Sequence, residues 1–516
     1  GSNNVGVGMG ALGANTTADS NTGVGYEALT ANTTGFSNTV LGVQSMAANT
    51  TGNSNVAIGN SSLIAATVSD RQVGIGVEAL KNYNNTSAGD HYNVAVGYAA
   101  GRDTVDGLNN VFVGGLAGYD GDNGDNNVFV GYAAGQNNAD SNNVGIGYQA
   151  LDANTTGGEN TAVGRDSLGS NTTADANVAL GYGSLRDNTT GSANVAIGYL
   201  ALEENTTGSN NTAVGFQALE ENTTASANTA VGYQSFAAVT TGTRNTGLGY
   251  HSGLNATSND NVVVGYAAAE ALTSGSSNII IGSKSGQNLT EGNNNIVMGV
   301  EALDADTLGD RNVAIGNQAL SAQNFTSSTD VYNVAVGHQA LTSSTTGNKS
   351  VAVGGLALQS NTTGIDNVGL GYAALNANTT ANDNTAVGNK ALLSNTTGAT
   401  NAAVGSLALD ANTTGSENTA VGASALSANT TASENAAFGH NALLSNTTGT
   451  RNVAVGSLAL DANTTANDNT AVGYDAMSAN TTGEKNVVVG TYAFDANTTG
   501  SFNTVVGRAA LSANTD

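Results

Sequence analysis

The stretch NTAVGFQALEENTTASANTAVGYQSF, residues 211–236, decides the fold because it states nearly the same phrase twice. NTAVG at 211–215 returns at 228–232, seventeen residues later. The glycine that closes this phrase, which we call the marker glycine, recurs from Gly8 to Gly507 and defines 30 repeats. Of the 29 intervals between marker glycines, 25 are 17 residues long, two are 21 and two are 16. Such a period is typical of a solenoid, in which each repeat buries its apolar side on its neighbours.

The composition also favours a repeat architecture over a set of globular domains. The 516 residues include 69 Gly and no Pro, Cys or Trp, and only 10% are charged. The net charge is −26 with 13 Lys and Arg, so we expect no binding to nucleic acid or anionic membranes, which both need basic patches. No run reaches the roughly 18 apolar residues of a membrane span, and we expect no membrane insertion by this segment.

The columns of the repeat predict the shape of one coil. Asn stands four residues before the marker glycine in 28 of 30 repeats, and the residues three and one before it are β-branched or otherwise apolar. This alternation predicts a short strand, and the marker glycine is expected at a corner with positive φ or at a close backbone approach. Ala or Ser stands three after it, Leu usually stands four after it, and an Asn-Thr-Thr turn follows. We therefore predict an all-β parallel β-roll or β-helix of about 30 coils, with two short strands per coil. It would run through 1–516 as one continuous array without a separate globular domain.

The position two residues before the marker glycine forms a second apolar column. It is Gly or Ala in 22 repeats and Val, Ile or Phe in eight. Because strand residues alternate sides, we expect this column to point outward and to pack on the same column of sister chains in a homo-oligomer. The alternative is that the Asn-Thr-Thr segment of the same chain covers it. The alanines of the predicted oligomer seam are Ala57, Ala95, Ala162, Ala179, Ala196, Ala213, Ala230, Ala314, Ala386, Ala420, Ala454 and Ala471.

These motifs carry a family resemblance. NVAIG at 194–198 and 312–316, together with NTAVG, resembles the strand motif of trimeric autotransporter adhesin heads. The resemblance implies a left-handed parallel β-roll and a homotrimer, although this repeat is longer than the usual head repeat. The longer pattern NTAVGYQAL, present here in variants such as NTAVGFQAL at 211–219, is similar to repeats of phage tail-fibre and adhesin-like fibre proteins. The implied function is an extracellular or cell-surface fibre shaft or adhesin, or alternatively the shaft of a virion tail fibre.

The titratable residues offer little chemistry. The four His residues lie in different coils, there is no Cys, and no Ser-His or acid pair recurs. Catalysis needs such groups to converge in a pocket, so we expect this protein not to be an enzyme. The best metal candidate is YDGDNGDNN at 119–127, which places Asp120, Asp122 and Asp125 in one Gly-rich loop suited to Ca²⁺. A solvated acidic turn is the alternative, and no other cofactor is expected.

The Asn-Thr-Thr turns fit the acceptor pattern for N-glycosylation, and their regular pitch would set sugars in a row. The alternative is that Asn simply suits a tight corner. The candidate acceptors are Asn15, Asn32, Asn49, Asn154, Asn171, Asn188, Asn205, Asn222, Asn361, Asn378, Asn395, Asn412, Asn429, Asn446, Asn463, Asn480 and Asn497.

Two further surface patterns suggest ligands. Tyr follows the marker glycine in eleven repeats, among them Tyr199 and Tyr233. A row of such rings could stack on host or cell-surface glycans, or it could only brace neighbouring coils. The Thr ladders suggest ice binding, a different class of function. Flat ice-binding faces need Thr-x-Thr, whereas the two Thr of each turn are adjacent and would face opposite ways in a strand.

Two features concern the regularity of the array. The 21-residue coils 77–97 and 317–337 carry extra residues around 83–92 and 324–332. We predict that these bulge outward and leave the strand ladder in register. Residues 1–8 and the closing LSANTD lie in one phase of the repeat, and we expect chains to join end to end into a filament.

Overall fold

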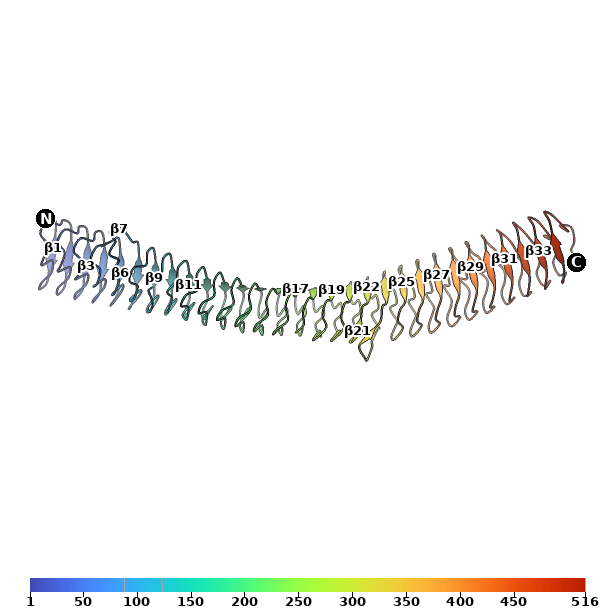
Figure 1. Ribbon diagram of the computed structural model, residues 1–516, viewed down its shortest axis with the longest axis horizontal. Coiled ribbons are helices and arrows are strands. Elements are labelled where there is room, and N and C mark those ends of the chain that lie inside the picture. Colours follow the sequence, from blue (N-terminus) through green and yellow to red (C-terminus); the bar gives the residue numbers. More distant parts are fainter. Residues whose placement is uncertain (88, 123, 516) are drawn as a thin grey trace. The chain divides into compact units, whose positions relative to one another are not determined.

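The computed structural model describes residues 1–87, 89–122 and 124–515, and these residues form strands and turns without any helix. The chain divides into two compact units, Gly1–Asn259 and Asp260–Asp516. Within each unit successive coils stack so that their strands pair in parallel (Figure 1). The predicted all-β parallel β-solenoid with a 17-residue spacing is therefore confirmed.

In the first unit fifteen three-residue strands form one ladder, and two short strands form a separate pair. The ladder follows chain order: β1 (Val5–Val7), β2 (Thr22–Val24), β3 (Thr39–Leu41), β4 (Val56–Ile58), β6 (Val73–Ile75), β8 (Val94–Val96), β9 (Val111–Val113), β10 (Val128–Val130), β11 (Val144–Ile146), β12 (Thr161–Val163), β13 (Val178–Leu180), β14 (Val195–Ile197), β15 (Thr212–Val214), β16 (Thr229–Val231) and β17 (Thr246–Leu248). The separate pair is β5 (Ser69–Asp70) and β7 (Gly89–Asp90).

The second unit repeats this plan with fifteen ladder strands and one separate pair. The ladder consists of β18 (Val262–Val264), β19 (Ile279–Ile281), β20 (Ile296–Met298), β22 (Val313–Ile315), β24 (Val334–Val336), β25 (Val351–Val353), β26 (Val368–Leu370), β27 (Thr385–Val387), β28 (Ala402–Val404), β29 (Thr419–Val421), β30 (Ala436–Phe438), β31 (Val453–Val455), β32 (Thr470–Val472), β33 (Val487–Val489) and β34 (Thr504–Val506). The pair is β21 (Gly309–Asp310) and β23 (Thr329–Asp330).

An ordinary 17-residue coil contains one strand, not the two that we predicted. The rest of the coil consists of turns in which Gln217 and Leu219 have φ of 52° and 51°. Positive φ at alternate residues is incompatible with an extended strand. These turns still bond to the next coil, since the Leu219 N–H donates to the carbonyl of Ser235 at 3.1 Å.

The marker glycine meets both of its predicted requirements. Gly215 has φ of 136°, a value that favours glycine. A Cβ at this position would also overlap the carbonyl oxygen of Gly232 in the next coil. The column therefore allows adjacent backbones to approach closely at the corner that follows each strand.

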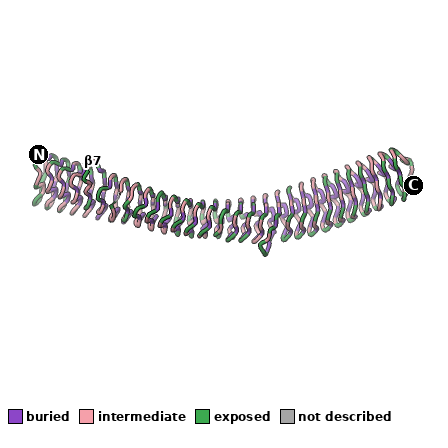
Figure 2. Tube along the Cα trace, viewed as in Figure 1, coloured by how far each residue is buried: buried purple, intermediate pink, exposed green. Residues whose placement is uncertain are grey.

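The strand faces are oriented opposite to our prediction. Ala179 of β13 has no exposed surface, whereas its neighbour Leu180 is 45% exposed. The same inversion recurs along both units, with buried residues lining the inside of each coil (Figure 2). The interior is thin, and the Leu and the Ala or Ser of the opposite wall already fill most of it. Little room remains at the inward strand position, which is Gly or Ala in 22 of 30 repeats, so the larger residues flanking it face outward.

Pairs of residues that face each other across the interior confirm which side of the strand points inward. Phe112 and Phe129 occupy the inward position of β9 and β10, are fully buried and stack with ring centroids 5.9 Å apart. Facing them, Gly118 and Gly135 replace the usual Leu, and a Cβ on either glycine would press against a Phe ring. In these two coils a large residue on one wall is thus compensated by glycine on the other, which keeps the core densely packed.

Two buried columns of Asn form hydrogen bonds at the corners of the coil. In the column four before the marker glycine, the Asn228 N–H donates to Asn211 Oδ1 at 3.0 Å, and Asn211 Nδ2 donates to the Ala225 carbonyl at 2.8 Å. In the Asn-Thr-Thr column, Asn222 Nδ2 donates to Asn205 Oδ1 at 2.7 Å. The bonds of the first column give hydrogen-bond partners to backbone groups inside the coil that would otherwise have none. The bonds of the second column join one Asn side chain to the next.

The two 21-residue coils leave the ladder in register, as predicted. Val73 of β6 pairs with Val94 of β8, and Val313 of β22 pairs with Val334 of β24. The added residues form the small pairs β5–β7 and β21–β23, and near β21 the extra loop projects from its coil (Figure 1).

Candidate functional site

The most extensive feature is the outward side of the strand ladder, which we call the outer strand face. It consists of the residues three and one before each marker glycine. Sixteen Val, ten Thr, two Ile and two Ala form the first column, while the second holds 18 Val, six Ile, four Leu, one Met and one Phe. Many of these side chains are substantially exposed, for example Leu248 at 50% and Phe438 at 42%. No position is charged and only ten of the 60 residues, the Thr, are polar, so each unit presents a largely apolar strip.

The acidic residues avoid this strip. None of the 39 Asp and Glu lies between the position four before and the position one after a marker glycine. They lie instead in the turns, as Glu204 and Glu221 do, and both of these residues are exposed. The coil thus separates an uncharged strand side from an acidic turn side.

Beside the outer strand face of the first unit runs a row of aromatic rings. Adjacent centroids are 5.2, 5.1, 5.0 and 5.1 Å apart and the rings are nearly parallel. Within the row each ring therefore covers the face of the next, which leaves little open ring face between neighbours. Sugars stack on ring faces, so this geometry favours bracing of coils over the glycan-binding alternative. The row comprises Tyr182, Tyr199, Phe216, Tyr233 and Tyr250.

The alanines of the predicted seam lie inside the coils and not on the surface. Ala57, Ala95, Ala162, Ala179, Ala196, Ala213, Ala230, Ala314, Ala386, Ala420, Ala454 and Ala471 all have no exposed surface in the single chain. A side chain without exposed surface cannot contact a second molecule while its coil stays folded. The prediction that this column points outward and forms the seam is therefore wrong. The same chain does cover the column, but with the wall of Leu and Ala or Ser and not with the Asn-Thr-Thr segment that the alternative named.

The Asn-Thr-Thr asparagines are also enclosed, which contradicts the predicted row of sugars. All of the 17 candidate acceptors except Asn15 have no exposed surface. Their amide nitrogens are hydrogen-bond donors within the coil, as Asn205 Nδ2 is to Asn188 Oδ1 at 2.8 Å and to the Gly208 carbonyl at 3.0 Å. A nitrogen in this position cannot carry a sugar in the folded coil.

The Thr residues of the same turns present one row of free hydroxyls and not two. The Thr206 hydroxyl donates to the Thr223 carbonyl at 2.9 Å, whereas Thr207 is exposed. The paired rows that a flat ice-binding face requires are therefore not formed by these turns.

The acidic loop at 119–127 directs its three carboxylates to three different places. Asp122 Oδ1 accepts from the Val105 N–H at 2.9 Å, and Asp125 Oδ1 accepts from the Leu108 N–H at 2.8 Å. Asp120 Oδ1 lies 3.5 Å from Arg102 Nη2. Asn123 of this loop lies outside the described residues. Among the residues that are described, no three His, Asp or Glu side chains gather in a way that could hold a metal ion. The geometry therefore supports the alternative of an acidic turn that bonds to the preceding coil.

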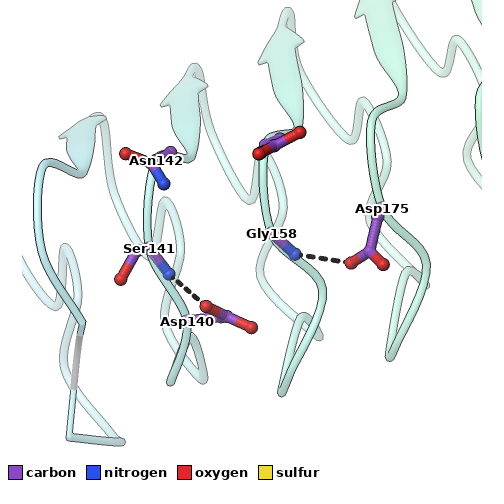
Figure 3. Close-up of a pocket in the computed structure, with 6 residues that line it drawn as sticks. Asp140, Ser141, Asn142, Gly158 and Asp175 are labelled. Carbon is purple, nitrogen blue, oxygen red and sulfur yellow. Dashed lines mark hydrogen bonds between the residues drawn. The ribbon is translucent and has the colours of Figure 1, made fainter.

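A shallow pocket of about 290 Å³ opens where a coil is one residue short (Figure 3). Three residues separate Asn138 from Asn142 in the 16-residue coil, where an ordinary coil has four. Its lining includes Asp140, Glu159 and Asp175. Asp140 Oδ1 accepts from the Ser141 N–H at 2.7 Å, and Asp175 Oδ1 accepts from the Gly158 N–H at 2.9 Å. Two of its three carboxylates thus already serve the turn, and no nucleophile–base pair lines it.

The 21-residue coil of the first unit contains a buried pair that the sequence analysis did not single out. Tyr83 has no exposed surface and His91 is 2% exposed, and their ring centroids lie 6.0 Å apart at 64°. Tyr83 stands where Asn begins an ordinary Asn-Thr-Thr turn. That replacement was the available signal, since a polar ladder cannot continue through a phenol ring.

Comparison with known proteins assigns no family to this chain. No family model matches the sequence, and neither does any curated protein. Among the described residues, no helix is long and apolar enough to cross a bilayer.

Proposed function

We propose that this chain is the structural shaft of an extracellular fibre or adhesin, and that chains associate side by side, as a homotrimer, through the outer strand face. The observation that carries this proposal is the uncharged, largely apolar strip along each unit. The resemblance of NVAIG and NTAVG to adhesin-head motifs supports the homotrimer and a left-handed coil. A virion tail-fibre shaft is the alternative within the same class, because it needs the same kind of solenoid.

The size of the strip supports association. Fifteen strands per unit, about 4.8 Å apart and each presenting a strip on the order of 10 Å wide, make roughly 700 Å². Patches beyond about 600 Å² are unusual on monomers, and a standard interface buries about 800 Å² per partner. The whole outer strand face is therefore large enough for a stable complex.

The distribution of charge favours the same surface. Two chains that each carry a net charge of −26 repel one another through their turns. The outer strand face contains no carboxylate, so contact there brings the fewest like charges together. Because salt screens the repulsion between the acidic turns, association should strengthen as ionic strength rises.

The test is the mass of the soluble chain by light scattering, with a matched pair of variants. The first variant changes Ile197, Val214 and Val231 on the outer strand face to Lys. The control changes Thr190, Thr207 and Thr224, exposed residues of the turns, to Lys. Both variants add three positive charges within neighbouring coils, but only the first places them in the proposed interface.

We expect three times the chain mass of 50.8 kDa for the unmodified protein and for the control, and a single chain for the outer-face variant. A single-chain mass for the unmodified protein would contradict the proposal. Equal dissociation of both variants would show that added charge, and not its position, separates the chains.

A further inference from the structure

The two 21-residue coils are related position by position, with an offset of 240 residues. Each contains a clasp at its surface, in which Arg71 pairs with Asp90 and Arg311 pairs with Asp330. A Tyr hydroxyl adjoins each clasp, since Tyr92 donates to Asp90 at 2.9 Å and Tyr332 lies 3.3 Å from Asp330. The coils thus share their outer fastening and differ mainly inside.

Inside the second coil the groups at the position of Tyr83 are matched, whereas Asn312 Oδ1, which corresponds to Gln72 Oε1 of the first coil, is buried without a hydrogen bond. Gln323 Nε2 donates to Asp306 Oδ2 at 2.8 Å, and Gln323 Oε1 accepts from Asn333 Nδ2 at 2.9 Å. Val331, which is fully buried, occupies the position that corresponds to His91. This coil therefore holds no titratable group at that position.

Inside the first coil the corresponding groups lack partners. No hydrogen bond of normal geometry reaches Tyr83 Oη or either ring nitrogen of His91, all of which are buried. The Ser87 backbone nevertheless lies near His91, and the Asn85 and Asn93 side chains lie near Tyr83. Buried polar atoms are nearly always satisfied, because an unmet donor or acceptor costs about 1–3 kcal/mol. The interior of this coil is therefore the weaker of the two.

The surroundings of His91 oppose its protonation. Burial lowers the pKa of His91, and this effect exceeds the opposing effects of the Asp70 carboxylate and the Ser87 backbone. Asp70 Oδ1 already accepts from the Asn53 N–H at 2.6 Å. The other charged or titratable groups around the pair are Asp90 and Arg71 of the clasp, Tyr83, Tyr92, and Asp106 and Asp125 of the following coils.

We propose that the first 21-residue coil is an acid-sensitive element, in which protonation of His91 separates β7 from β5 and exposes Tyr83 and His91 while β6 and β8 stay paired. The contacts that must open are few: the β5–β7 pairing, the Arg71–Asp90 clasp, and the His91 backbone N–H, which donates to the Asp70 carbonyl at 3.4 Å. Because the strand ladder does not pass through β7, the coil can open locally without unfolding the unit. The element goes beyond the proposed fibre function and does not depend on it.

The direction of the pH effect follows from the lowered pKa. Neutral His91 stabilises the closed coil above the ordinary pKa of about 6.5, and this contribution is lost as pH falls through the folded-state pKa. Below about pH 6.5 the open state takes up the proton more readily than the closed state, so opening should become up to tenfold easier per pH unit until the closed state is protonated as well.

The experiment is hydrogen exchange measured by mass spectrometry on the full chain between pH 7.5 and 5, with rates divided by intrinsic rates. The peptide spanning 81–93 is compared with the peptide spanning 321–333 in the same sample. His91→Val copies the second coil, and His91→Gln keeps a polar side chain that cannot titrate. We expect at least tenfold loss of protection at 81–93 in the unmodified chain, and none at 321–333 or in either variant.

Equal protection of 81–93 at all pH values would overturn the proposal. So would a loss of protection that persists in both variants, since another group would then be titrating. If His91→Val were poorly folded, His91→Gln alone would decide the matter.

Discussion

On each strand of the ladder the smaller side chains usually face inward and the larger apolar ones face outward, which is the reverse of what is expected for a protein core. In β13 the small Ala179 is inside and the larger Leu180 is outside, and β17 repeats the pattern with Gly247 inside and Leu248 outside. The cause lies on the opposite wall, where Leu and Ala or Ser fill the interior. The comparison teaches that the space left by the facing wall, and not side-chain size, decides which side of a strand is buried.

The largest expected loss of stability comes from a Glu substitution on the inward side of a strand, compared with the same substitution on its outward side. Ala213→Glu should unfold its coil locally, at a cost of about 4 kcal/mol, because an ionised carboxylate would be buried without a partner. Val214→Glu, one residue away, should leave the coil folded because its side chain points outward. Limited proteolysis and peptide-level hydrogen exchange around 205–222 distinguish the two. If Val214→Glu were the more damaging variant in a single chain, the orientation described here would be reversed.

A somewhat smaller effect should test how the two walls share volume. Phe112→Ala leaves a cavity, and Gly118→Leu places a side chain against the Phe112 ring; each should cost about 3 kcal/mol. The double variant restores the usual Ala and Leu combination and should be more stable than either single variant. Leu tolerates the backbone here, since Gly118 has φ of 56° and Leu219 has φ of 51° at the equivalent position.

The readout is hydrogen exchange across 97–118 in the two single variants and the double variant. A favourable coupling energy of about 2 kcal/mol would show that the residues occupy one shared space. Additive losses would mean that the two walls do not compete for it.

The smallest effect concerns a charge that already lies inside. Asp306 is fully buried where most coils have Asn, and burial raises its pKa above the ordinary value. A raised carboxyl pKa means that its favourable contribution is present below the unfolded pKa and is lost as pH rises through the folded value. Asp306→Asn should therefore stabilise the coil by about 1 kcal/mol at neutral pH. The Asn side chain can still accept from Gln323.

The gain should disappear at a pH below about 3.9, where the unmodified carboxyl group is protonated in both states. Hydrogen exchange of 299–323 in the two proteins, compared at pH 7 and as far into the acid range as the folded chain allows, measures it. A stabilisation that did not shrink toward low pH would show that the carboxylate charge is not its cause.

The residue columns that make up the candidate site could be identified from the sequence, but their position inside or outside the coil could not. The columns of Val, Thr and Ala are visible in the sequence. Their alternation shows only that neighbouring residues face opposite sides of the strand, and not which side is buried. Exchanges such as that of Phe112 with Gly118 were the sequence signal that could have oriented them, because both residues must share a space. The Asn-Thr-Thr pattern likewise matched a glycosylation motif, and only the burial of Asn205 and its equivalents shows that the amide is used within the coil.

The sequence by itself determined the parallel coils, the place of each strand of the ladder, and the positive φ and close approach at the marker glycine. These follow from a period of 17 residues and from the conformations open to glycine, both of which are local properties. The tertiary structure alone decided which strand side is buried and why one strand per ordinary coil suffices. It also decided where Tyr83 and His91 meet. Each of these depends on what the facing wall or the next coil contributes to a space only a few side chains wide, and no residue carries that information alone.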